Sequence, residues 1–188
     1  MARWEPGTRD RLRTAALELY LEQGYEATTV EQIAARAGVT ERTYFRHFPD
    51  KREVLFDADD HLGKSFVAGI TDAAPGPPMA LVVAGLEASA SVFPDSRRPW
   101  SRARQTVIEA NPALREREML KLNSLGTAIA AALRARGIAE PTASVTAQTG
   151  LSVFHVAFET WISDAEHRGI GEIQRALIEE LKTVVAEA

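Results

Sequence analysis

Residues 28–56 constrain the fold of this chain more than any other segment. Overlapping Ser/Thr-x-x-Glu/Gln capping boxes begin at Thr28 and at Thr29, so a helix is predicted to start within one residue of Val30. The apolar residues that follow share one helical face, and they are Val30, Ile33, Ala34 and Ala37. Gly38 comes directly after this face and is expected to take the left-handed conformation that ends many helices. The segment therefore begins with a short helix and a tight turn.

A second short helix is predicted from Thr40 to His47. Thr40 can cap its first turn, and Pro49 ends it because a proline ring disfavours helical dihedrals in the preceding residue. Phe45 and Phe48 are expected to point inward and to supply most of its buried surface. Two short helices joined by a glycine turn are the signature of a helix-turn-helix unit, whose second helix can enter the major groove of DNA.

The capping pair Asp50 and Glu53 predicts a third, longer helix from Lys51 through Ile70. Proline and glycine residues divide the rest of the chain into further helices. These are predicted over residues 9–23, 79–93, 100–110, 112–136, 141–167 and 171–186. We therefore expect an all-α protein of about nine helices. Residues 1–52 are predicted to form a three-helix DNA-binding domain and residues 53–188 a larger helical domain for ligand binding and dimerisation.

The predicted reading helix places Arg42 and Thr43 near its N-terminus, with Thr40 at the cap. These two side chains should point outward because the aromatic residues are needed inside. An arginine can pair bidentately with guanine, and a threonine offers a hydroxyl and a methyl group to base edges. Arg42 as a merely solvated charge is the weaker interpretation. The pattern therefore favours sequence-specific recognition of duplex DNA.

Other polar residues of the segment are predicted to contact phosphates, which position a protein without specifying sequence. They are Thr28, Thr29, Tyr44, His47 and Lys51. The two threonines lie at a helix N-terminus, where backbone N–H groups attract anions. Three alternatives stay open: Tyr44 as a core residue, His47 as a plain surface residue, and Lys51 as part of a solvated helix start.

The charge distribution is compatible with this prediction although the net charge is −4. Residues 1–52 carry nine Lys and Arg against eight Asp and Glu, so the acidic excess lies in the remainder. Residues 36–52 alone hold five basic residues against two acidic ones. Because binding depends on the face presented to the phosphates, an acidic body does not exclude a DNA-binding protein.

Several short motifs between Arg9 and Phe56 resemble the DNA-binding domain of the tetracycline-repressor (TetR) family of bacterial regulators. The matching pieces are Ala15–Leu19, Gly24-Tyr25, Thr28–Val30, Ile33-Ala34, Ala37–Val39, Tyr44–Phe48 and Lys51. They cover about a quarter of the chain. The resemblance implies an all-helical homodimer, usually a repressor, that leaves a palindromic operator when a small molecule fills its C-terminal body.

Candidate ligand contacts in the body are aromatic or apolar residues with a few polar ones. They are Phe66, Trp100, Arg104, Met119, Asn123, Phe154, Phe158 and Trp161. Each of them can equally be a core or surface residue. The stretch around Phe154 is similar to family members that bind acyl-type or other lipophilic molecules, and Arg104 would then anchor an anionic group.

Two apolar stripes near the end of the chain predict a four-helix dimer interface. Their members are Val145, Thr149, Val153, Val156, Ile173, Leu177, Leu181 and Val184. A two-fold operator calls for two reading helices, which favours the dimer. Both stripes could instead face the core of their own chain.

Composition excludes several other classes of protein. The chain has no cysteine and only four scattered histidines, so we expect no thiolate metal site, no disulfide and no cofactor. No apolar run reaches the length of a membrane span, and the N-terminus does not resemble a signal peptide, so a cytoplasmic protein is expected. Two alternatives remain: an enzyme with an incidental helix-turn-helix, although no catalytic motif is present, and an architectural DNA-binding protein, which would need a more basic surface.

Overall fold

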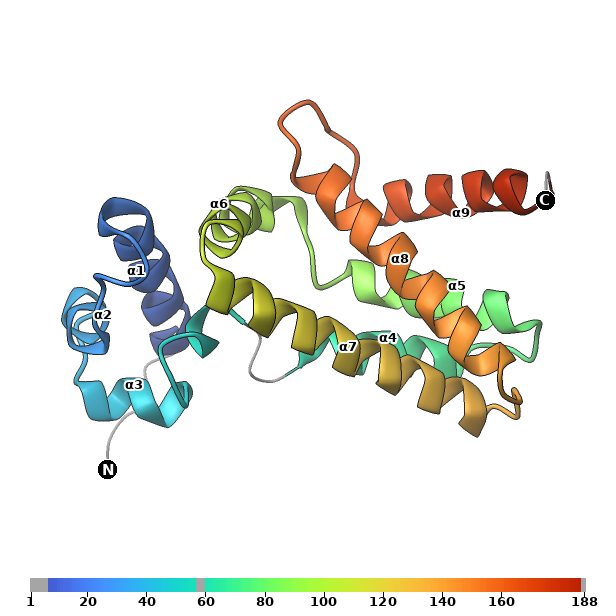
Figure 1. The fold of residues 1–188 in the computed structure, drawn as a ribbon, viewed down its shortest axis with the longest axis horizontal. Helices are drawn as coiled ribbons and strands as arrows, with labels where there is room; N and C mark the ends of the chain where they lie inside the picture. Colours follow the sequence, from blue (N-terminus) through green and yellow to red (C-terminus); the bar gives the residue numbers. More distant parts are fainter. Residues whose placement is uncertain (1–6, 57–59, 187–188) are drawn as a thin grey trace. The chain divides into compact units, whose positions relative to one another are not determined.

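The computed structural model describes residues 7–56 and 60–186 of the chain, and in these residues every element of regular structure is helical (Figure 1). The elements are α1 (Thr8–Gln23), α2 (Val30–Arg36), α3 (Glu41–His47), η1 (Glu53–Leu55), α4 (His61–Asp72), α5 (Pro78–Ala90), η2 (Asp95–Arg97), α6 (Arg98–Glu109), α7 (Pro112–Ala135), α8 (Thr142–Ile162) and α9 (Ile170–Ala186). The predicted all-α fold class is confirmed.

The chain forms two compact units. Of the described residues, the first unit combines residues 7–56 with residues 103–118, and the second combines residues 60–102 with residues 119–186. The first unit therefore differs from the expected domain of residues 1–52, because it also holds η1, the end of α6 and the start of α7. These added segments are tied to it by side-chain bonds from Arg104 to the Leu55 carbonyl and from Arg117 to Glu53.

The first unit has a core of apolar side chains from α1, α2, α3, η1 and the adjoining parts of α6 and α7. Its most deeply buried members are Leu12, Ala16, Ile33, Tyr44, Phe48, Val54, Leu55, Ile108 and Leu114. Two hydroxyl groups of this core donate hydrogen bonds to backbone carbonyls: Tyr20 to Lys51 at 2.8 Å and Tyr44 to Asp50 at 3.2 Å. The aromatic residues thus hold the short segment after α3 against α1.

The predicted single helix from Lys51 through Ile70 is wrong. The Asp50 carboxylate accepts bonds from the amides of Arg52 and Glu53, which supports only the one turn of η1. Phe56 then adopts an extended conformation and is buried beneath the Arg104 guanidinium, 5.0 Å from its ring. A new helix, α4, begins after Asp60, whose carboxylate caps it through the amide of Gly63.

The second unit is organised around α5, which packs against α4, α8 and α9. Glycine allows these close approaches. A Cβ atom on Gly85 would meet the Phe66 ring at 2.4 Å, and one on Gly150 would meet Val82 at 2.3 Å. Phe66 is consequently enclosed between helices and has no exposed surface.

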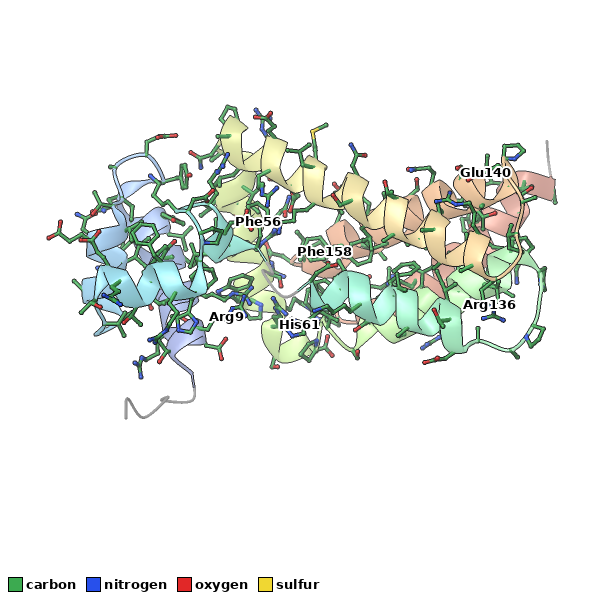
Figure 2. All side chains as sticks on the ribbon, turned by 90° about the horizontal axis from the view of Figure 1, so that it is seen from below. Arg9, Phe56, His61, Arg136, Glu140 and Phe158 are labelled. Atoms are coloured by element: carbon green, nitrogen blue, oxygen red, sulfur yellow. The ribbon has the colours of Figure 1, made fainter. Side chains whose placement is uncertain are left out.

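Arginine side chains fix the ends of several helices in the second unit by donating to backbone carbonyls. Arg136, at the end of α7, donates to the carbonyls of Ile70 and Thr71 at the end of α4 (Figure 2). Arg102 of α6 donates to the carbonyls of Ile162 and Ser163 at the end of α8. Helix α8 therefore ends at Ile162, before the predicted end near His167, because Ser163 is extended and the chain turns away.

Candidate nucleic-acid interface

The turn between α2 and α3 has the geometry expected of a glycine-ended helix. Gly38 has a φ of 69°, its amide donates to the Ala35 carbonyl at 3.1 Å, and the Val39 amide donates to the Ala34 carbonyl at 2.9 Å. This pair of bonds is the Schellman motif, which satisfies the last carbonyls of a helix. The prediction that Gly38 is the left-handed terminal residue is confirmed, and the turn directs the chain into α3.

Thr29, rather than Thr28, caps α2. The Thr29 hydroxyl accepts from the amide of Gln32 at 3.2 Å, and the Gln32 side chain accepts from the amide of Thr29 at 2.9 Å, which completes a capping box. Thr28 is only 2% exposed, and its hydroxyl donates to the Gly24 carbonyl at 2.8 Å. The Thr28 hydroxyl therefore has a structural role, and the phosphate contact predicted for this helix N-terminus stays a prediction. Thr29 is exposed, and its phosphate contact stays a prediction.

Thr40 caps α3 as predicted. Its hydroxyl oxygen accepts from the amide of Thr43 at 3.3 Å and lies 3.2 Å from the Thr43 hydroxyl oxygen. Thr40 is exposed and Thr43 is half-buried. The cap fixes the start of the reading helix α3, and with it the direction in which the next side chains leave the helix.

One face of α3 is open to solvent and consists of Glu41, Arg42, Phe45 and Arg46. Among the described residues, neither Arg42 nor Arg46 makes a side-chain hydrogen bond or ion pair. The neighbouring arginines behave differently: Arg36 pairs with Glu22 at 2.8 Å, and Arg52 pairs with Asp50 at 3.0 Å. Sequence analysis assigned Arg42 to this face correctly but did not assign Arg46.

Tyr44 and Phe45 have exchanged the roles expected of them. Tyr44 has no exposed surface, and its burial raises the pKa of its phenol, whereas Phe45 is 52% exposed. Tyr44 is therefore a core residue, which is the alternative left open above, and the phosphate contact predicted for it and the inward orientation predicted for Phe45 are both wrong. The physical reason is that Tyr44 and Phe48, four residues apart, form the buried stripe of α3, and Phe45 lies one residue off that stripe.

Lys51 directs its ammonium group into the first unit. Two of its N–H groups donate to backbone carbonyls, to Tyr25 at 2.8 Å and to Thr28 at 3.0 Å, and the nitrogen lies 4.1 Å from the centre of the Tyr25 ring. This arrangement ties the loop before α2 to the segment after α3. A phosphate contact by Lys51 stays a prediction, but the placement supports a structural role.

His47 is half-buried at the end of α3. Desolvation lowers the pKa of its imidazole below the usual value, and the positive charges of Arg46 and Arg9 lower it further. In the free protein these effects favour the neutral form of the imidazole. The phosphate contact of His47 stays a prediction.

Most of the aromatic ligand candidates belong to one cluster in the second unit. Phe93, Phe154, Phe158 and Trp161 lie with ring centres 5.5–6.3 Å apart. Phe154 and Trp161 are buried, whereas Phe158 and Trp100 are half-buried (Figure 2 labels Phe158). Phe93, from the loop after α5, completes the cluster through ring contacts with the other three residues.

The polar ligand candidates lie outside this cluster. Arg104 belongs to the first unit, where its guanidinium donates to the Leu55 carbonyl at 2.7 Å and pairs with Glu118 at 2.9 Å. This pairing supports a structural role for Arg104, and its predicted role as an anion anchor stays a prediction. Met119 and Asn123 are both exposed on α7, and their ligand roles stay predictions.

The predicted dimer residues divide into three groups. Val153 and Ile173 are buried in the core of the second unit, so their assignment to a dimer interface is wrong. Leu177, Leu181 and Thr149 are half-buried. The remaining members are exposed hydrophobic residues, and they are Val145, Val156 and Val184. A dimer interface that includes these three exposed valines stays a prediction.

Sequence reasoning missed a buried ion pair in the first unit. Glu53 is 4% exposed and accepts a hydrogen bond from the guanidinium of Arg117, which lies 64 residues further along the chain. In the sequence, Glu53 was interpreted only as the capping partner of Asp50. No nearby residue indicated that it pairs with a distant arginine. Among the described residues no group of acidic and histidine side chains could hold a metal ion, and no helix combines the length and apolarity of a membrane span.

The fold and the open face of α3 define a helix-turn-helix protein. Residues 12–58 match the family described as bacterial regulatory proteins, tetR family, and residues 76–186 match the MftR C-terminal domain. The second match alone covers more than half of the chain. This chain belongs to the TetR family of bacterial regulatory proteins.

Similar proteins agree with this assignment. The regulator TcmR of Streptomyces glaucescens is 51% identical over 63 residues, which are 34% of this chain and 28% of TcmR. This chain therefore matches less than a third of that relative's length. The fold resembles FadR of Thermus thermophilus, solved with lauroyl-CoA (TM-score 0.54, 22% identity, 91% of each chain). It also resembles FadR of Bacillus subtilis, solved with stearoyl-CoA (TM-score 0.55, 20% identity, 90% of this chain and 95% of that one).

Proposed function

We propose that this protein is a sequence-specific DNA-binding transcriptional regulator that represses its target genes until a small molecule releases it. The observation that carries the proposal is the open face of α3, where Arg42 and Arg46 have no intramolecular partner among the described residues. A buried or paired arginine serves the fold, whereas an unpaired one on a helix fixed by a Schellman turn is available to base edges and phosphates.

A homodimer is part of this proposal. Single reading helices bind weakly, and family operators are palindromic, so two copies related by a two-fold axis would present two α3 helices to successive turns of the groove. The exposed valines Val145, Val156 and Val184 on α8 and α9 support an interface there. Such residues gain free energy when a second copy removes them from water.

The effector is proposed to be lipophilic, with an acyl chain as the first candidate. Two observations support it: the aromatic cluster in the second unit, and the acyl-CoA ligands of the two FadR proteins with a similar fold. The effector releases DNA only if it binds the free protein more tightly than the operator-bound protein. Lauroyl-CoA and stearoyl-CoA should therefore lower operator affinity in titrations, and equal affinity for both states would exclude this mechanism.

The test of DNA binding is selection of bound fragments from genomic DNA by the purified full-length protein, followed by measurement of Kd on the selected operator. Arg42→Ala should weaken operator binding by about 1–3 kcal/mol and relax the preferred sequence, as expected for loss of a bidentate base contact. Arg36→Ala is the matched control, because it removes the same charge from an arginine that already pairs with Glu22.

The outcome separates the proposal from its rivals. An architectural protein would bind random and selected duplexes alike at ~0.15 M salt. If selection returns no preferred sequence, the proposal fails.

A further inference from the structure

Phe45 on α3 is an aromatic residue whose ring is about half exposed to solvent. Its neighbours Tyr44 and Phe48 have no exposed surface, whereas half of the Phe45 side chain faces solvent. Its ring makes a T-shaped contact with Tyr44, with ring centres 5.5 Å apart. An aromatic ring left in water loses the free energy that burial would provide, so folding alone does not explain a phenylalanine at this position.

The position of Phe45 on α3 determines what it can meet. Residues three and four apart are neighbours on a helix, so Phe45 shares its face with Arg42 and Glu41, and Arg46 follows it directly. Both arginines lack an intramolecular partner among the described residues. Because two positive charges flank the ring, the surface around Phe45 suits a polyanionic partner, and duplex DNA is the partner proposed above for this face.

The chemistry of the ring then narrows the contact within the duplex. Phenylalanine has no hydroxyl group and cannot hydrogen-bond a phosphate or a polar base edge. In the major groove, thymine is the base that presents an apolar group, its C5-methyl, and phenylalanine is among the side chains that suit it. A tyrosine at this position could donate a hydrogen bond from its hydroxyl to the phosphate backbone of DNA. Phenylalanine cannot do so, and this favours a base contact over a phosphate contact.

We propose that Phe45 is a specificity-determining residue that contacts the C5-methyl group of a thymine in each operator half-site. This inference rests on the proposed function, since it assumes that α3 enters the major groove. It adds an apolar base contact beside the polar one of Arg42. The preferred half-site should therefore contain a thymine whose methyl group contributes to binding. Base pairing of that thymine should not account for the preference of the protein for it.

The test replaces each thymine of the selected operator, one position at a time, by deoxyuridine, which pairs identically but lacks the methyl group. At one position per half-site the replacement should weaken binding of the unaltered protein about fourfold, the fold-change that corresponds to ~0.8 kcal/mol for one methyl-sized group removed from an apolar contact. Phe45→Ala should weaken binding to the thymine operator by at least as much. This variant should then bind the deoxyuridine operator as well as it binds the thymine operator. The two losses are therefore not additive.

Leu21→Ala is the matched control variant. Leu21 is an apolar residue of α1 with the same exposed fraction as Phe45, 52%, and it belongs to the same unit. This variant should retain the full difference between thymine and deoxyuridine. A thermal melt of each variant checks that the fold is intact.

A second measurement uses the unaltered protein and does not depend on a variant. With 5-iododeoxyuridine at the sensitive position, the iodine takes the place of the methyl group, and irradiation should crosslink the DNA to the peptide that contains Phe45. Additive losses, insensitivity to every deoxyuridine, or a crosslink to another peptide would each overturn this inference. All three outcomes require a selected operator, so they are distinguishable from failure of the proposed function, in which selection finds none.

Discussion

Different kinds of interaction stabilise the interior of each of the two units of this protein. In the first unit, caps and a glycine turn define the short helices, and hydrogen bonds from Tyr20 and Lys51 to backbone carbonyls join segments that lie 31 and 26 residues apart. In the second unit, long helices approach each other closely at glycines, and Phe66 fills the space between them. The first unit thus combines local helix caps with polar side-chain contacts to the backbone, and the second depends on shape complementarity between closely packed helices.

This difference matters for function. A unit whose short helices are fixed by caps and turns can leave one helical face exposed to solvent, as α3 does with Arg42 and Phe45. A unit built from packed helices changes shape only when its packing changes. The arrangement suits a protein in which one part presents fixed side chains to DNA and the other responds to an apolar molecule.

The largest effect is expected when phenylalanine is replaced by alanine in each unit and the losses of unfolding free energy are compared. Phe66→Ala should lower the free energy of unfolding by about 3–5 kcal/mol, because it leaves a cavity between α4 and α5. Phe45→Ala should lower it far less, since half of that ring is already in water. Urea denaturation of the two variants provides the comparison, and similar losses would show that the units are not stabilised differently.

Lys51→Met should lower the free energy of unfolding by about 1.5–3 kcal/mol, the usual range for hydrogen bonds to a charged group. The variant keeps the apolar stem and removes the bonds to the Tyr25 and Thr28 carbonyls. A phosphate contact predicts another result, in which stability is unchanged and the dependence of log K on log salt flattens by about one. Denaturation and a salt titration of operator binding together decide between the two roles.

The smallest effect concerns helix capping. Thr29→Ala should cost about 1 kcal/mol, because it removes the capping box of α2. Thr127→Ala is the control: Thr127 lies exposed within α7, where its hydroxyl donates to the Asn123 carbonyl, and alanine is the better helix former. If both variants lost the same stability, the cap would not distinguish the first unit from the second.

The sequence predicted local features of the fold well. Gly38 and the caps at Thr29 and Thr40 could be assigned because their signals lie within four residues. The predicted helix across residue 56 failed because nothing local reveals the Arg104 guanidinium that covers the Phe56 ring. In the same way, the pairing of Glu53 with Arg117 depends on tertiary structure alone.

The candidate site was predicted in part. Arg42 was assigned to the open face, but Tyr44 and Phe45 were exchanged, since two adjacent aromatic residues give periodicity no means to choose between them. The stripes of α8 and α9 show the same limit: Val153 and Ile173 fit the apolar pattern of a dimer interface and yet lie in the core of their own unit. An apolar stripe identifies a buried face and not the partner that buries it.

Operator binding by Arg42→Ala, with Arg36→Ala measured alongside, tests the central claim most directly. We expect Arg42→Ala to lose about 1–3 kcal/mol on the selected operator, to lose much less on random DNA, and to accept altered bases at one position of each half-site. Arg36→Ala should bind nearly as the unaltered protein does. If the two variants behave alike, or if Arg42→Ala keeps the full sequence preference, α3 is not the element that reads the operator.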